Sequence, residues 1–124
     1  MSVGVVLAVL AAGAVGAVAR WLVSKLFAGR RFPVAVLVVN VGGSAIGGAV
    51  LALAQTTSIT TDARLILLTG LCGGLSTFST FSVETVQLVL DGRAKDAALS
   101  VAANLALGIG AAGLAFAVVS LALA

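Results

Sequence analysis

The chain has 124 residues, of which 61% are hydrophobic and only 9% are charged. Its mean hydropathy of +1.27 exceeds what a water-soluble domain of this size could hide, so a soluble globular fold is excluded. The formal charge of +3 comes from lysines and arginines that flank apolar stretches, which is typical of a membrane protein and argues against a nucleic-acid partner. We therefore expect an all-α membrane protein.

Four apolar stretches are long enough to cross a hydrocarbon core, which takes about 20 residues. They predict one transmembrane domain over residues 1–124, with helices at about 3–23, 33–54, 65–90 and 97–121. The first stretch resembles a secretory signal around Ala11–Ala14, but it lacks a basic start and continues to Arg20 and Trp21, so we interpret it as a permanent helix. Before the third helix, Thr61 or Asp62 is the expected N-cap.

Small and polar residues recur at three- and four-residue steps in three of the predicted helices, which places each set on one helical face. The sets are Gly13, Gly16, Ala17 and Arg20, then Asn40, Gly43, Ser44 and Gly47, and finally Ser100, Asn104 and Gly108. Small residues let helix backbones approach closely in lipid, so packing explains the glycines. The two asparagines need hydrogen-bond partners in hydrocarbon, and their N–H groups are also donors that an anion could use.

The third stretch contains the least regular sequence, Gly70–Ser82. It has the paired glycines Gly73 and Gly74, and six hydroxyl residues fall between Ser76 and Thr85. Irregular backbone at membrane depth is tolerated only where it is buried in protein or lines a polar cavity. Polar side chains in that position usually mark a path for a hydrophilic species. We predict a helix break near Gly73–Thr77 and a site there for a small polar or charged species.

Catalysis is not expected, because the chain has no histidine and only four acidic residues, of which only Glu84 adjoins the polar stretch. A single cysteine, Cys72, permits no intrachain disulfide, and we expect it to be a small buried residue. The polar groups of the second, third and fourth helices are amides and hydroxyls, which donate hydrogen bonds and suit an anion better than a cation. Phe78 and Phe81 share a helical face, so their positive ring edges could both face an anion, although packing would also explain them.

Several motifs resemble the CrcB/Fluc family of fluoride channels, and the resemblance covers all four helices in order. The motifs are Gly13-x-x-Gly16-Ala17-x-x-Arg20, Val39-Asn40-x-x-Gly43-Ser44, Gly70-x-Cys72-Gly73-Gly74-x-Ser76-Thr77-Phe78-Ser79-Thr80-Phe81, and Val101-x-x-Asn104-Leu105 followed by Gly108. The resemblance implies a passive channel in a prokaryotic plasma membrane that exports fluoride from the cytoplasm and protects against its toxicity. It also implies an antiparallel, dual-topology dimer of two four-helix subunits with two pores.

The resemblance further implies a set of functional residues. Asn40 would donate to fluoride and Phe78 and Phe81 would face the pore, and the rest of the fluoride pathway would comprise Ser79, Thr80, Ser100 and Asn104. Arg20 and Glu84 would lie near the pore ends. A structural Na⁺ at the dimer interface would be bound by the backbone carbonyls of Gly73 and Ser76, shared with the partner subunit.

The basic residues are unevenly distributed between the two sides of the predicted helices. One side has only Arg64, whereas the other has Arg20, Lys25, Arg30, Arg31, Arg93 and Lys95. This count favours one orientation with the termini outside, whereas a dual-topology homodimer is expected to have balanced counts. Both an antiparallel homodimer and a heterodimer with a related subunit therefore stay open.

Two other functions are also compatible with four short helices. A small multidrug exporter forms similar antiparallel dimers, but it needs a membrane-embedded glutamate that the first helix here lacks. A non-transporting assembly subunit would explain the glycines but not the hydroxyl-rich break with its paired rings.

Overall fold

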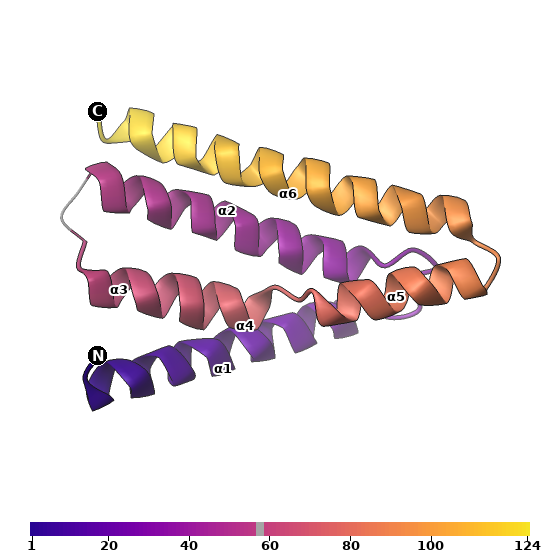
Figure 1. Cartoon of the computed structure of the whole chain (residues 1–124), viewed down its shortest axis with the longest axis horizontal. Coiled ribbons are helices and arrows are strands. Elements are labelled where there is room, and N and C mark those ends of the chain that lie inside the picture. The colour runs from indigo at the N-terminus through magenta and orange to yellow at the C-terminus, as the bar shows by residue number, and fades with distance from the viewer. Residues whose placement is uncertain (57–58) are drawn as a thin grey trace.

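The computed structural model describes residues 1–56 and 59–124, and all of the elements in these ranges are helices. Four helical segments are long and apolar enough to span a membrane: Val3–Leu26, Val34–Thr56, Thr61–Leu90 and Ala94–Ala122. The predicted class, an all-α membrane protein with four spans, is confirmed. Both termini lie at the same end of the bundle (Figure 1).

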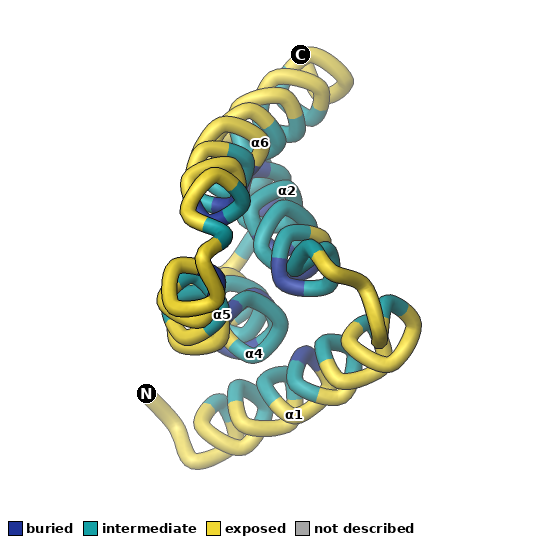
Figure 2. The backbone as a smooth tube through the Cα atoms, turned by 90° about the vertical axis from the view of Figure 1, so that its right-hand side faces the viewer, coloured by how far each residue is buried: buried dark blue, intermediate teal, exposed yellow. Residues whose placement is uncertain are grey.

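Three of the spans are continuous helices, α1 (Val3–Leu26), α2 (Val34–Thr56) and α6 (Ala94–Ala122). The third span consists of four parts, α3 (Thr61–Leu65), the π-helical segment η1 (Ile66–Cys72), α4 (Gly73–Leu75) and α5 (Ser79–Leu90). Helix α2 packs along α6, α1 packs along η1 and α4, and α5 packs against α6. Figure 2 shows the exposed residues on the outer sides of α1 and α6, where we expect lipid, and the buried ones turned toward the other helices.

The third span is broken as expected, and the break at Ser76–Phe78 overlaps the second half of the predicted range Gly73–Thr77. Ser76 is extended, with φ −78° and ψ 157°, and α5 begins at Ser79. Gly73 has ordinary right-handed helical angles, so the paired glycines do not themselves interrupt the helix. The position of Gly74 reflects packing, because a Cβ atom there would collide with the carbonyl oxygen of Gly13 on α1.

Glycines allow close approach at two helix contacts. On α1, a Cβ atom on Gly16 would lie 2.7 Å from the backbone nitrogen of Leu75, so the predicted packing face of this helix is confirmed there. On α2, the closest approach is made by Gly48, whose Cβ would collide with the backbone of Ala112, and not by Gly47, which the sequence analysis had selected. Helix α2 packs against both the third span and α6, and the predicted periodic set did not include Gly48.

The third span begins at a threonine cap. The side chain of Thr60 accepts a hydrogen bond from the Ala63 N–H at 3.0 Å, so the predicted N-cap at Thr61 or Asp62 was wrong. Thr60 has the extended backbone of an N-cap residue, and Asp62 falls in the first turn. A carboxylate in the first turn still stabilises the helix through its dipole.

Candidate functional site

The side chain of Asn40, on α2, holds the break in the third span. Its Nδ2 donates to the carbonyl of Thr77 at 3.1 Å, and its Oδ1 accepts the Thr77 N–H at 2.8 Å. Because the Thr77 N–H bonds to Asn40, it is not available to the carbonyl of Gly73, its usual partner four residues earlier. An amide from a neighbouring helix thus replaces hydrogen bonds that the broken helix cannot make, as a hydrocarbon environment requires.

A second amide, Asn104 on α6, completes this network. Asn40 Nδ2 also donates to Asn104 Oδ1 at 3.1 Å, and Asn104 Nδ2 donates to the Ser100 carbonyl at 2.8 Å. Both N–H groups of Asn40 and its oxygen are therefore engaged. Ser100 itself is 1% exposed, so within one subunit its side chain is closed off from the polar grooves described below.

Thr77 caps the second half of the broken span. Its Oγ1 accepts the Thr80 N–H at 3.1 Å, donates to Thr80 Oγ1 at 3.1 Å and lies 3.3 Å from Ser79 Oγ. Thr77 is only 6% exposed, so water cannot easily replace these bonds. Ser79 and Thr80 are predicted pathway residues, whereas Thr77 is not among them. Thr77 lies three residues before Thr80, whose N–H it accepts, and this is the spacing of an N-cap. That spacing could have indicated Thr77 from the sequence.

Four of the predicted pathway residues line one groove, which we call the amide groove. It has a volume of about 300 Å³ and is lined by Asn40, Ser44, Ser76, Thr77, Phe78, Phe81, Asn104 and Leu105. The Phe78 and Phe81 ring centroids are 6.1 Å apart with the ring planes tilted by 43°. Phe78 is 80% exposed, so its ring extends from the subunit and is free to contact lipid or a partner.

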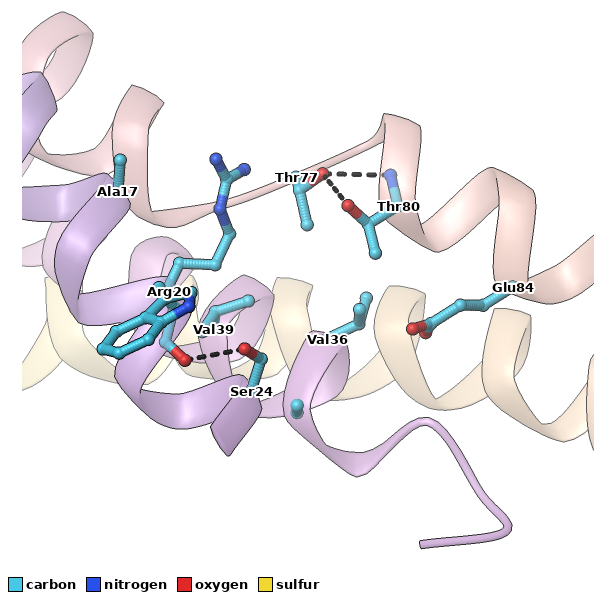
Figure 3. A pocket seen from close by; sticks show the side chains of 10 residues that line it. Ala17, Arg20, Ser24, Val36, Val39, Thr77, Thr80 and Glu84 are labelled. Carbon is cyan, nitrogen blue, oxygen red and sulfur yellow. Dashed lines mark hydrogen bonds between the residues drawn. The ribbon is translucent and has the colours of Figure 1, made fainter. Parts of the chain in front are cut away.

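The two predicted pore-end charges line a second recess of about 330 Å³, which we call the arginine recess. Figure 3 shows Arg20 and Glu84 at opposite ends of it, with Thr77 and Thr80 between them. Arg20 Nη1 makes a long contact of 3.5 Å to the Ser76 carbonyl. One carboxylate oxygen of Glu84, Oε2, is buried and has no hydrogen-bond partner among the described residues.

Thr77 lines both the amide groove and the arginine recess, so the two spaces meet at the helix break. Ser79 is exposed and lines neither space, but its hydroxyl contacts the hydroxyl of Thr77. Gly73 is exposed and Ser76 is half-buried, next to the same break. No group of three or more His, Cys, Asp or Glu residues comes together in residues 1–56 and 59–124. The oxygen atoms at this break belong to backbone carbonyls, hydroxyls and side-chain amides.

The arrangement places neutral amides and hydroxyls, two aromatic rings and one guanidinium around a backbone break. These groups can replace part of the hydration shell of a small anion, which is favoured by amide and hydroxyl donors and by ring edges. Covalent chemistry would need an activated nucleophile with a base in reach. The polar groups that line the amide groove are amides and hydroxyls, which do not meet that requirement.

Comparisons with known proteins agree on one family. The family profile described as "CrcB-like protein, Camphor Resistance (CrcB)" matches residues 7–116. The chain is 44% identical to "Fluoride-specific ion channel FluC 1" of Yersinia pseudotuberculosis over 117 residues, which is 92% of each chain. It is 48% identical to "Fluoride-specific ion channel FluC" of Chlorobaculum tepidum over 107 residues, 84% of this chain and 85% of the relative. With a match over most of its length, this chain belongs to the CrcB family.

Proposed function

We propose that this chain is the subunit of a passive, fluoride-selective ion channel that exports fluoride from the cytoplasm. The observation that carries the proposal is the amide groove, a neutral donor-lined space at a helix break inside a membrane-spanning segment. The name of the relatives, fluoride-specific ion channel, supports fluoride as the ion. Four spans and bacterial channel relatives make this a multi-pass protein of a prokaryotic membrane, and it is a channel and not an enzyme.

The test is anion efflux from liposomes that contain the purified protein. Vesicles loaded with fluoride and with chloride are compared after a potassium ionophore provides the counter-ion current. We expect rapid fluoride efflux that needs no proton gradient, little chloride efflux, and no fluoride efflux from protein-free vesicles. Proton-coupled drug export without fluoride flux would favour the multidrug exporter, and no flux of either kind would favour the assembly subunit.

The fluoride pathway in this proposal comprises Asn40, Phe78, Phe81, Ser79, Thr80, Ser100 and Asn104. Support comes from the grouping of four of them around the amide groove. Helix α5 also begins at the break, so the positive end of its dipole lies at membrane depth, where discontinuous helices commonly bind anions. Arg20 and Glu84, which line the arginine recess, are proposed to face the ends of the path.

A structural Na⁺ is the proposed cofactor, held by the backbone carbonyls of Gly73 and Ser76. These groups fit a small hard cation, because such ions prefer oxygen ligands. The Gly73 carbonyl loses its usual N–H partner to Asn40, and the Ser76 carbonyl accepts a long contact of 3.5 Å from Arg20. A bound cation would satisfy both carbonyl oxygens at the break. The two carbonyls cannot satisfy each other, because both are acceptors.

The proposed assembly is an antiparallel dimer, in which a second copy or a related subunit covers the outer side of the break. The exposed ring of Phe78 supports a partner at this position, since it lines a polar groove that lipid alone would not satisfy, and Gly73 is exposed three residues before Ser76, which lines the same groove. In such a pair, the carbonyls of two breaks could share one cation.

A further inference from the structure

The hydrogen bonds that Asn40 already makes limit how its amide could bind an anion. This inference rests on the proposed function. Of the two N–H groups of Asn40, one donates to the Thr77 carbonyl and the other to Asn104 Oδ1. An anion that binds to Asn40 therefore cannot use a free donor. It must take over one of these two hydrogen bonds.

The bond to Thr77 is the harder one to give up. It forms a pair with the bond from the Thr77 N–H to Asn40 Oδ1, so the carboxamide is matched to both backbone polar groups of one residue. An anion that took this N–H would leave the Thr77 carbonyl without its partner in a segment that crosses hydrocarbon, and would break up the pair. The bond to Asn104 is a single neutral bond of 3.1 Å between side chains, and both side chains line the amide groove.

The orientation of the Asn104 amide is fixed by partners on both sides. Its Nδ2 donates to the Ser100 carbonyl, and its Oδ1 accepts from Asn40. Exchange of the two ends would oppose two oxygens at Ser100 and two N–H groups at Asn40. Asn104 thus presents a partly negative oxygen to Asn40, and an oxygen in this position repels an anion.

We propose that Asn104 Oδ1 is a replaceable acceptor that holds the second Asn40 N–H until fluoride arrives and takes its place. A charge-assisted hydrogen bond is roughly twice as strong as a neutral one, so fluoride competes successfully for this N–H while the pair on Thr77 stays intact. Asn40 then serves two purposes at once, as a clamp on the break and as an ion ligand. Asn104 is a positioning residue that acts through Asn40.

The replacement of Asn104 by leucine tests the competition by the sign of its effect. Asn104→Leu keeps the approximate volume but removes the competing oxygen, so the fluoride concentration that gives half-maximal flux should fall about fivefold, the factor that corresponds to about 1 kcal/mol for a neutral hydrogen bond. If Asn104 instead donates directly to fluoride, this concentration should rise. Gln55→Leu removes an exposed carboxamide near the C-terminal end of α2, the helix that carries Asn40. It serves as the control and should leave the half-maximal concentration unchanged.

Nuclear magnetic resonance of the unmodified protein gives a second readout, because Asn40 and Asn104 are the only asparagines in the chain. Selective asparagine labelling should yield two side-chain amide groups, assigned with Asn104→Leu or, if that variant does not fold, with Asn104→Ser. Fluoride should move one proton of Asn40 strongly downfield and alter the Asn104 carbonyl carbon, with the other Asn40 proton little changed. A shift of the Asn104 N–H protons without a change at Asn40 would overturn the exchange. Wild-type protein that passes no fluoride would refute the proposed function itself, whereas flux with unchanged Asn40 signals would refute only the exchange.

Discussion

The hydroxyl of Thr77 is the most heavily used side-chain atom at the break, and its removal gives a sharp prediction. Thr77→Val replaces the hydroxyl with a methyl group of similar size. The Thr80 N–H, which donates to Thr77 Oγ1 at 3.1 Å, then has no acceptor at the start of α5. Thr80 Oγ1 and Ser79 Oγ lose a contact as well.

The expected cost follows from this one unsatisfied N–H. Loss of an N-cap side chain costs about 0.5–2 kcal/mol, and an unpaired buried donor costs about 1–3 kcal/mol. These ranges describe the same hydrogen bond and do not add, so we expect about 2 kcal/mol, toward the upper part because Thr77 is only 6% exposed. Since about 1.4 kcal/mol corresponds to a factor of ten, the formed break should become about thirtyfold less populated relative to unformed states.

The assay compares Thr77→Val with the same substitution at a threonine within α5. The Thr85 hydroxyl donates to the Phe81 carbonyl at 2.7 Å, so Thr85→Val removes a hydroxyl on which no backbone N–H depends. Fluoride efflux from liposomes should fall more than tenfold in Thr77→Val and little in Thr85→Val. Thr77→Ser keeps Oγ and should restore most of the flux.

Resistance to thermal unfolding in detergent, followed by size-exclusion chromatography, should decrease in the same order. Equal flux and equal stability of the two valine variants would show that the hydroxyl of Thr77 does not hold the break. Loss of flux in Thr77→Ser as well as Thr77→Val would also refute the reasoning, because the capping oxygen is present in the serine variant.

Three further outcomes are expected. Asn40→Asp should abolish fluoride flux while the dimer still forms on a sizing column, because a carboxylate can accept the Thr77 N–H but cannot donate to Thr77 or Asn104 and repels the anion; normal efflux would contradict this role. Phe78→Ile should reduce flux severely without loss of the subunit fold, because the ring is 80% exposed, and Phe81→Ile should act similarly; unchanged flux would assign both rings to packing. Purification with a bulky organic cation in place of Na⁺ should reduce both flux and dimer stability, and undiminished activity after verified removal of Na⁺ and Li⁺ would exclude the Gly73 and Ser76 carbonyls as an essential cation site.

Hydropathy alone predicts the four spans of this chain well, because each span must cover the same hydrocarbon thickness. The grouping of Asn40, Phe78, Phe81 and Asn104 around one groove could also be expected, since polar groups at membrane depth must find one another. These features depend on the bilayer as a solvent. They need no knowledge of how individual helices contact.

The exact position of the break and the engagement of Asn40 could not be predicted in this way. A pair of glycines in a sequence usually predicts a helix break, but Gly74 is helical here. Its lack of a side chain makes room for the backbone of Gly13 on α1. The break begins at Ser76, where Asn40 from α2 offers a substitute for the helical hydrogen bonds of Thr77. Both outcomes are set by neighbours distant in sequence, which local propensity does not contain.

The charges of the chain are concentrated at one end of the bundle. Asp62 and Arg64 cancel at the end where α3 begins, so the whole net charge of +3 resides at the other end. Two of the six basic side chains there are partly committed to internal contacts. Arg93 pairs with Asp96 at 2.8 Å and also donates to the Arg31 carbonyl, and Arg20 reaches the Ser76 carbonyl within the bundle.

Four basic side chains at this end remain available to the membrane surface: Lys25, Arg30, Arg31 and Lys95. Lys25 lies over the ring of Trp21 at 5.3 Å and Arg30 over the ring of Phe27 at 5.8 Å, an arrangement suited to the headgroup region. Against the single Arg64 at the opposite end, this count still favours one orientation. In the proposed antiparallel pair of identical chains, half of the copies must insert against that preference. Contacts across the break, and not the charges of the loops, then have to fix the orientation of the second copy.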